Sequence, residues 1–422
     1  WERFSYYGMR ALLVLYMVAP AVQGGLAFTT EFAMRLYGIY TMLVYVTSIP
    51  GGFIADNYLG ARRSVLIGGI IIACGHFALA VPSMITFYFG LSLIILGTGL
   101  LKPNVSTMLG CLYPAGDQRR DSGFSIYYMG INIGAALAPL VCGFLAQSTE
   151  FKSFLSGTLH ADPLTSWHWG FAAAGVGMIF GLLQFVLGGK TLGTVGIEPS
   201  SKKSSFNAPG NVQGPLTADE CKRLGAIGIL FLFAVLFWAI YEQGGSSLNL
   251  FADKLTDCRI FDWRFPSSWF QTLPALFVII LAPLFSQLWV KLGSKEPSSP
   301  AKFAYGLFFL GLGILVMVPA SVLSQHDKAS PFWLFSVFLL MCVGEMCLSP
   351  VGLSTVTKLA PARFLSLTMG VWMLTNGLGN YLNGELARFF NQHDVAALVY
   401  LFGGMAVAVF VCTVVLALLV PT

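Results

Sequence analysis

The sequence predicts an all-α membrane protein in which twelve transmembrane helices form two bundles of six. First, 56% of the 422 residues are hydrophobic and only 10% are charged, whereas soluble domains carry roughly 25% charged residues. Second, apolar runs of about 20 residues, the length that crosses the hydrocarbon core of a bilayer, recur along the whole chain. Third, one long polar stretch divides these runs into two sets of six.

The apolar runs indicate helices rather than strands. In lipid every backbone polar group needs a partner within the protein, so spanning segments are helices or closed barrels. Barrel strands would alternate apolar and polar residues over about ten positions, and segments such as Leu182–Leu187 and Val407–Val420 do not alternate. The net charge of +5 is spread over the loops and does not suggest a nucleic-acid partner.

The expected spans follow one another with short loops, except at the polar stretch. The first six cover about 1–22, 33–55, 64–84, 86–107, 122–147 and 167–189. The last six cover about 224–246, 267–291, 302–322, 331–358, 364–389 and 395–420. Residues 190–223 are rich in Lys, Ser, Pro and Gly and are typical of a flexible linker. We therefore expect an N-terminal bundle over 1–189, a cytoplasmic linker over 190–223 and a C-terminal bundle over 224–422.

The basic residues predict the orientation of the spans. Fourteen of the 24 lysines and arginines, among them Arg62, Arg63, Lys202, Lys203 and Arg363, lie on one set of alternate loops. Seven lie on the opposite set. Because cytoplasmic loops carry the excess of positive charge, both termini and the linker are predicted to face the cytoplasm. We expect a multi-pass protein of the plasma (inner) membrane, acting as a monomer.

The eight cysteines are scattered, mostly within apolar runs, and none has metal-binding or redox spacing. We expect them to be packing residues and predict neither a metal site nor a cofactor. His76 lies in an apolar run and is expected to be a hydrogen-bonded core residue.

Charged residues within the spans are the main candidates for function, because a charge in the membrane is costly. On the first helix, Glu2, Arg3, Tyr6, Tyr7 and Arg10 fall within an arc of about 140° at 100° per residue. This face is polar and cationic. Glu2 and Arg3 could instead lie at a helix end with their charges in the interface, but Arg10 is about two turns deeper.

Three more charges lie within later spans: Lys102 in the fourth, Glu242 in the seventh and Glu345 in the tenth. Two cations, Arg10 and Lys102, therefore come from the first half, and both carboxylates come from the second. Opposite charges on opposite halves could bridge the halves, and breaking the bridges could open a cavity. The alternative is a set of static ion pairs that stabilise the bundle.

Two six-helix halves around a central cavity resemble the major facilitator superfamily, whose substrate sites lie near mid-membrane. The segments Gly51–Asp56 and Gly60–Arg63, between the second and third spans, resemble the signature loop of that superfamily. Glycines there permit a tight turn, and Asp56 can pair with the arginines across helix ends.

Further motifs resemble the proton-dependent oligopeptide transporter family, in its bacterial form. The matching blocks run from residue 1 to about residue 380. They are Glu2–Gly8, Gly51–Arg63, Leu101–Asn104, Phe124–Gly134, Phe237–Leu248 and Gly344–Ser354. The resemblance implies a proton-coupled symporter that imports di- and tripeptides by alternating access, driven by the proton gradient.

The resemblance also implies roles for individual residues. Proton coupling would involve Glu2, Arg3, Arg10, Lys102, Glu242 and Glu345. Substrate contacts would come from Tyr6, Tyr7, Arg10, Tyr45, Lys102, Asn132, Trp238, Glu242, Glu345, Ser349 and Trp372. For the tyrosines and tryptophans, simple packing is the competing interpretation. Another glutamate of the family's first-helix motif would lie three positions before Glu2, outside this sequence.

The chain departs from the family pattern at two positions. The family's eighth helix usually carries Asn followed by Pro, but here the residues are Pro274 and Ala275, so one contact to the peptide backbone is in doubt. Animal members use a histidine in the second helix, and Gly38 aligns there. Proton handling should therefore rest on carboxylates.

A short peptide carries an ammonium and a carboxylate at a separation set by its length. We predict that Glu345 receives the ammonium, with Asn132 nearby, and that Arg10 and Lys102 hold the carboxylate. Protonation of Glu242 would release Arg10 for the substrate. A symporter of the same family for another small solute, such as a peptide-like drug or nitrate, remains an alternative. A nutrient sensor and an intramembrane enzyme are less well supported, because neither a signalling domain nor a catalytic motif is visible.

Overall fold

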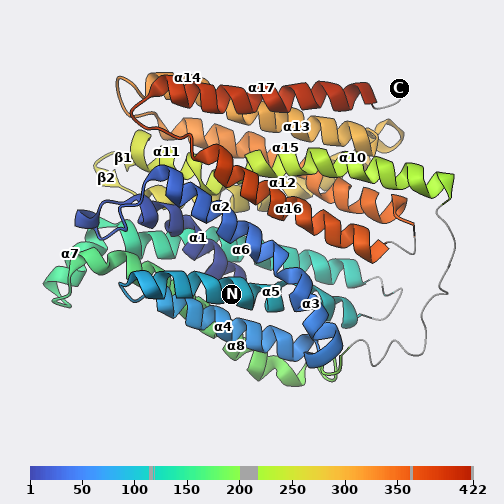
Figure 1. The fold of residues 1–422 in the computed structure, drawn as a ribbon, viewed down its shortest axis with the longest axis horizontal. Helices are drawn as coiled ribbons and strands as arrows, with labels where there is room; N and C mark the ends of the chain where they lie inside the picture. The colour runs from blue at the N-terminus through green and yellow to red at the C-terminus, as the bar shows by residue number, and fades with distance from the viewer. Residues whose placement is uncertain (114–116, 118, 200–216, 362–364, 420–422) are drawn as a thin grey trace. The chain divides into compact units, whose positions relative to one another are not determined.

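The computed structural model describes residues 1–113, 117, 119–199, 217–361 and 365–419, and these residues are almost entirely helical (Figure 1). Within them, the strands β1 (Arg259–Ile260) and β2 (Trp263–Arg264) form one short antiparallel hairpin. Half of the expected linker, including Lys202 and Lys203, lies outside the described residues, as does Arg363.

The chain divides into two compact units. The first comprises Trp1–Ala27 and Tyr40–Asn211, and the second comprises Phe28–Ile39 and Val212–Thr422, as far as these ranges are described. Helix α2 (Thr30–Val46) therefore contributes its first part to the second unit and its last part to the first. The placement of the bundle boundaries at 189 and 224 stays a prediction.

Besides the end of α2, the described residues of the first unit form seven α-helices. They are α1 (Glu2–Val18), α3 (Ser48–Ile54), α4 (Ala61–Leu79), α5 (Met84–Cys111), α6 (Arg119–Gln147), α7 (Thr149–Gly157) and α8 (Ser166–Leu187). Short helical turns cover η1 (Ala21–Gln23), η2 (Ala55–Leu59), η3 (Pro163–Thr165) and η4 (Gly188–Lys190).

Besides the start of α2, eight α-helices are described in the second unit. They are α10 (Ala218–Tyr241), α11 (Ser247–Leu255), α12 (Thr272–Leu292), α13 (Ser299–Leu315), α14 (Met317–Leu323), α15 (Pro331–Leu359), α16 (Leu365–Ala387) and α17 (Val395–Leu419). Short helical turns cover η6 (Glu242–Gly245), η7 (Ser267–Gln271) and η8 (Gly293–Lys295).

Each of the twelve expected spans coincides with a long helix. Among the described residues, ten helical segments are long and apolar enough to cross a membrane. The other two expected spans are α1, with only 17 residues, and α16, which carries Asn376, Asn380 and Asn383. Polar side chains that lower the apolarity of a span are tolerated where they face protein rather than lipid, and all three asparagines are buried.

Several spans end or break where the sequence analysis expected continuous helix. Helix α1 stops at Val18 rather than near 22, because Pro20 follows and Gly24 adopts a left-handed conformation with φ of 78°. The second span is interrupted after Val46, and the seventh after Tyr241. Helix α10 starts at Ala218, inside the expected linker, where Thr217 and Glu220 form a capping box.

In the signature loop, the contacts of Asp56 and Arg62 differ from the pairing considered from the sequence. Asp56 is exposed and forms no ion pair with Arg62 or Arg63 among the described contacts. Instead, the Arg62 guanidinium donates to the carbonyls of Gly189 (2.8 Å) and Gly193 (3.0 Å). Because the last carbonyls of a helix lack partners within it, Arg62 stabilises the turn that follows α8.

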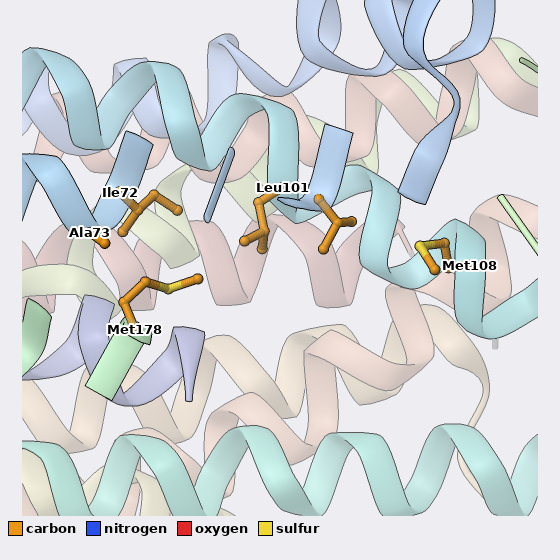
Figure 2. Packing of buried hydrophobic residues seen from close by; sticks show 6 residues of the cluster. Ile72, Ala73, Leu101, Met108 and Met178 are labelled. Carbon is orange, nitrogen blue, oxygen red and sulfur yellow. The ribbon is translucent and has the colours of Figure 1, made fainter. Parts of the chain in front are cut away.

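Close helix packing in the first unit depends on small residues. A Cβ atom at Gly68 of α4 would lie 2.6 Å from the Gly97 carbonyl oxygen of α5, and one at Gly97 would lie 2.6 Å from the Gly68 oxygen. Any side chain there would separate the helices. Figure 2 shows the apolar cluster beside this contact, in which Ile72 and Ala73 of α4, Leu101 and Met108 of α5 and Met178 of α8 pack together with Val65.

In the second unit, small residues likewise allow close packing where α2 meets α16. A Cβ atom at Gly384 would lie 2.6 Å from the Met34 oxygen and 2.7 Å from the Gly38 Cα atom, so the two backbones are in direct contact. Beside this contact, Arg35 and Arg388 lie within 4.0 Å of Glu31 and Glu385. A side chain at Gly38 has no room either, because a Cβ atom there would lie 2.9 Å from the Gly384 Cα atom.

Candidate functional site

The predicted site residues fall into two groups, one in each unit, that we call the cationic and the acidic half-site. The cationic half-site lies in the first unit and consists of Glu2, Arg3, Tyr6, Tyr7, Arg10, Tyr45, Lys102 and Asn132. The acidic half-site lies in the second unit and consists of Trp238, Glu242, Glu345, Ser349 and Trp372.

At the start of α1, Glu2 and Arg3 form an ion pair. The Arg3 Nε atom lies 3.1 Å from Glu2 Oε2, and both side chains are less than one-fifth exposed. The pair relies on proximity rather than on an aligned hydrogen bond, because Arg3 Nε has no hydrogen-bond partner among the described residues. Arg3 also interacts electrostatically with Tyr45 and Tyr127. The charges of α1 are therefore tied to α2 and α6.

Lys102 of α5 lies against the ring of Tyr45. Its Nζ atom is 3.4 Å from the ring centroid, a cation–π contact that is favourable where water is scarce. The next residue, Pro103, has no backbone N–H and so cannot bond the carbonyl one turn earlier in α5. Tyr45 thus contacts one cation, Lys102, and interacts with another, Arg3.

The remaining members of the cationic half-site are placed by α1 and α6. Tyr6 and Tyr7 meet edge to face with ring centroids 5.3 Å apart. Asn132 of α6 is buried, and its Nδ2 atom donates to the Tyr128 carbonyl at 2.9 Å. That bond uses one of four hydrogen-bonding positions of the amide, so Asn132 retains capacity for another partner. Arg10 is half-buried on α1.

A cavity of about 530 Å³ opens beside Glu2 and Arg3 within the first unit. It is lined by residues of α1, α4, α5, α6 and α8, and Tyr127 joins the two charged residues on its wall. Most of the remaining lining is apolar, including Met178 and Leu101 of the cluster in Figure 2. The ion pair therefore borders a space that can hold water or a solute.

In the acidic half-site, Glu242 lies at a break between two helices. Helix α10 ends at Tyr241, the turn η6 follows, and α11 begins at Ser247. The Gln243 amide donates to the carbonyls of Ala239 and Asn383, while the Ser246 hydroxyl donates to Asn383 Oδ1 at 2.5 Å. Such side chains are needed because a broken helix in a membrane leaves backbone groups unpaired. The buried polar network thus holds Glu242 at the end of α10.

Glu345 of α15 is joined to α10 through Tyr241. The Tyr241 hydroxyl donates to Glu345 Oε2. The Tyr241 ring meets Trp238 edge to face at 5.5 Å, and Glu242 interacts electrostatically with Glu345. The structure therefore brings together Trp238, Glu242 and Glu345.

Ser349 and Trp372 are less closely tied to this group. Ser349 is half-buried, about one turn beyond Glu345 on α15. Trp372 of α16 is buried against Phe231 of α10, with ring centroids 5.9 Å apart. Phe231 lies about two turns before Trp238, so this contact places Trp372 away from the carboxylates along α10. No described contact joins it to Glu345.

Comparison with known proteins identifies the family of this chain. The sequence model of the POT family matches residues 62–212 and 208–403. The chain belongs to the POT family. An uncharacterized transporter, YclF of Bacillus subtilis strain 168, is 43% identical over 93% of this chain and 86% of its own length. A di-/tripeptide transporter of Lactococcus lactis subsp. cremoris is 35% identical over 92% of this chain and 87% of its own length.

A solved structure of a POT transporter has the same fold. A mutant of peptide transporter POT, crystallised with alafosfalin, superposes with a TM-score of 0.88 at 39% identity, covering 99% of this chain and 91% of its own. This POT protein is accordingly an all-α, multi-pass membrane protein of the major facilitator fold. The fold and family predicted from the sequence are confirmed.

The structure adds residues that the sequence analysis did not select. Tyr127 and Tyr241 lie inside the family motifs, beside Arg3 and Glu345, but no sequence feature separates them from other aromatic residues. Gln243, Ser246 and Asn383 support the break at Glu242. The adjacent Gly244 and Gly245 were a usable signal, because glycines within an apolar run often mark an interruption.

Proposed function

We propose that this POT protein is a proton-coupled symporter that imports di- and tripeptides across the plasma (inner) membrane by alternating access. It acts as a monomer, with both termini in the cytoplasm, and is driven by the proton gradient without a further cofactor. Family membership supports transport, and the di-/tripeptide transporter of L. lactis supports the substrate class. Its task is transport rather than catalysis.

The charge of the two half-sites is the observation that carries this proposal. The first unit offers Arg10 and Lys102, and the second offers Glu242 and Glu345. A zwitterionic peptide presents a carboxylate to the cations and an ammonium to a carboxylate, and both contacts are charge-assisted. A simple anion such as nitrate has no ammonium for Glu345, so the acidic half-site favours peptides.

The residue roles follow from this assignment. Glu345 receives the substrate ammonium, with Asn132 hydrogen-bonding nearby, while Arg10 and Lys102 receive the carboxylate. The aromatic residues Tyr6, Tyr7, Tyr45, Trp238 and Trp372, with Ser349, contact the varied side chains. Glu2, Arg3 and Glu242 serve proton coupling together with Arg10, because protonation of Glu242 releases Arg10 to the substrate.

The energetics of a single proton are sufficient. A proton that crosses 100 mV gains about 2.3 kcal/mol, and one pH unit adds about 1.4 kcal/mol. Together these supply about 3.7 kcal/mol, enough to concentrate a peptide of zero net charge several hundredfold.

The test is uptake of labelled dialanine into proteoliposomes. We expect accumulation that requires the pH gradient or the membrane potential and is abolished by an uncoupler, with tetra-alanine and nitrate as controls. Glu242→Gln should abolish uphill uptake but retain exchange of dialanine. Normal accumulation by this variant would remove Glu242 from the coupling, and transport of nitrate in place of dialanine would overturn the substrate assignment.

A further inference from the structure

Tyr241 is placed to act on Glu345, although none of the family motifs singled it out. Its hydroxyl contacts both Glu345 Oε2 and, at 3.7 Å, the Cys342 sulfur. The Cys342 thiol in turn donates to the Pro274 carbonyl oxygen at 3.6 Å. A phenol can donate only one hydrogen bond. A carboxylate is a far stronger acceptor than sulfur, so Tyr241 donates its hydrogen bond to Glu345.

The ring of Tyr241 is fixed by its neighbours on α10. It stacks on Phe237, four residues earlier, with centroids 5.6 Å apart and an interplanar angle of 17°. It meets Trp238, three residues earlier, at 5.5 Å and 82°. Because the ring is already held, the hydrogen bond to Glu345 costs little additional side-chain entropy.

Glu345 needs such a donor. Glu345 is half-buried on α15, and a carboxylate withdrawn from water needs hydrogen-bond donors to keep the ionised form that an ammonium requires. On α12, the Pro274 carbonyl is only an acceptor and accepts a hydrogen bond from the Cys342 thiol. Among the described contacts, Tyr241 provides this donor.

We propose that Tyr241 is a positioning residue that orients the Glu345 carboxylate for the amino terminus of the substrate, and so selects ligands with a free ammonium. This inference rests on the proposed function, because it assumes that Glu345 binds the ammonium of a peptide. It goes further in assigning amino-terminal selectivity to a hydroxyl group on α10.

The experiment compares two ligands in proteoliposomes: dialanine, and lactoyl-alanine, in which a hydroxyl group replaces the ammonium. Tyr241→Phe removes only the hydroxyl and keeps the ring stacking. We expect the KM for dialanine to rise about tenfold, as for loss of a hydrogen bond to a charged group, with the maximal rate unchanged. The inhibition constant of lactoyl-alanine should change less than twofold, because that ligand does not need an oriented carboxylate.

Two variants separate positioning from packing. Tyr241→Gln restores a donor and should recover part of the dialanine affinity, whereas Cys342→Ala removes the other contact of the hydroxyl and should change neither constant more than twofold. Equal losses for both ligands in Tyr241→Phe, or a fall in maximal rate alone, would overturn the inference while leaving peptide transport intact. A wild-type protein that takes up no dialanine would overturn the proposed function, and this inference with it.

Discussion

Lys102, Glu242 and Glu345 each lie near a disturbance of regular helix. Lys102 precedes Pro103 in α5, Glu242 follows the last residue of α10, and Glu345 is five residues before Pro350 in α15. Proline frees a carbonyl one turn earlier, and a helix end leaves several carbonyls unpaired. These polar backbone groups lower the free-energy cost of placing a charge in the membrane interior. The sequence identified the three charged residues, but only the structure explains how they are accommodated.

A buried hydrogen bond between α1 and α4 offers a prediction at the scale of single residues. Ser5 Oγ and His76 Nε2 are 2.6 Å apart, and both residues are fully buried. Ser5→Ala should lower the free energy of unfolding by about 1–3 kcal/mol, because His76 would lose this partner in a dry environment. Thermal unfolding of the purified protein in detergent measures the effect.

The double variant Ser5→Ala/His76→Leu is the matched control. Replacing both partners with apolar groups removes the unpaired polar atom, so the double variant should unfold at a higher temperature than Ser5→Ala alone. If Ser5→Ala unfolds like the wild type, the hydrogen bond is not important for stability. The expectation that His76 is a hydrogen-bonded core residue is confirmed by the structure.

At the scale of elements, the sequence located the helices but not their interruptions. Apolar runs continue through Thr47, Glu242 and Val316, whereas the helices break there. The breaks are stabilised by residues distant in the sequence, such as Asn383 beside Gln243. Local periodicity contains no information about such partners. For the same reason α7, α11 and the β1–β2 hairpin were not anticipated.

The contact of α2 with α16 depends on backbone packing rather than on its ion pairs. Gly384→Leu should strongly destabilise the second unit, because a Cβ atom there already lies 2.6 Å from a carbonyl oxygen; overpacking typically costs about 1–3 kcal/mol and can cost more. Arg35→Gln should cost less than about 1 kcal/mol, because its partners Glu31 and Glu385 are partly exposed. The unfolding midpoints of the two variants are measured in detergent. If Arg35→Gln destabilises the protein more than Gly384→Leu, the contact does not depend on backbone packing.

At the scale of the whole molecule, orientation remains the prediction that most needs a measurement. Of the eight free cysteines, Cys221 at the start of α10 is exposed, and Cys258 between α11 and β1 is buried. The two positions lie on opposite sides in the predicted topology. Burial raises the pKa of the Cys258 thiol to about 12, so at pH 7 it is almost entirely protonated and reacts slowly.

A membrane-impermeant maleimide tests the orientation in right-side-out vesicles. We expect Cys221 to be labelled only after permeabilisation, since the start of α10 is predicted to face the cytoplasm, and Cys258 to remain unlabelled at pH 7 in either case. The labelling that is lost in the variant Cys221→Ser is the labelling of Cys221. Labelling of Cys221 in intact vesicles would reverse the predicted topology.

The sequence by itself determined the fold class, the family and the chemical character of the two half-sites. These properties follow from apolar length, from motifs and from the cost of placing charge in a membrane, all of which are local. Only the tertiary structure decided which side chains support each charge: Tyr45 beneath Lys102, Tyr241 on Glu345, and Asn383 at the break beside Glu242. Each of these contacts joins helices that are distant along the chain, and packing geometry, which no local pattern encodes, selects them.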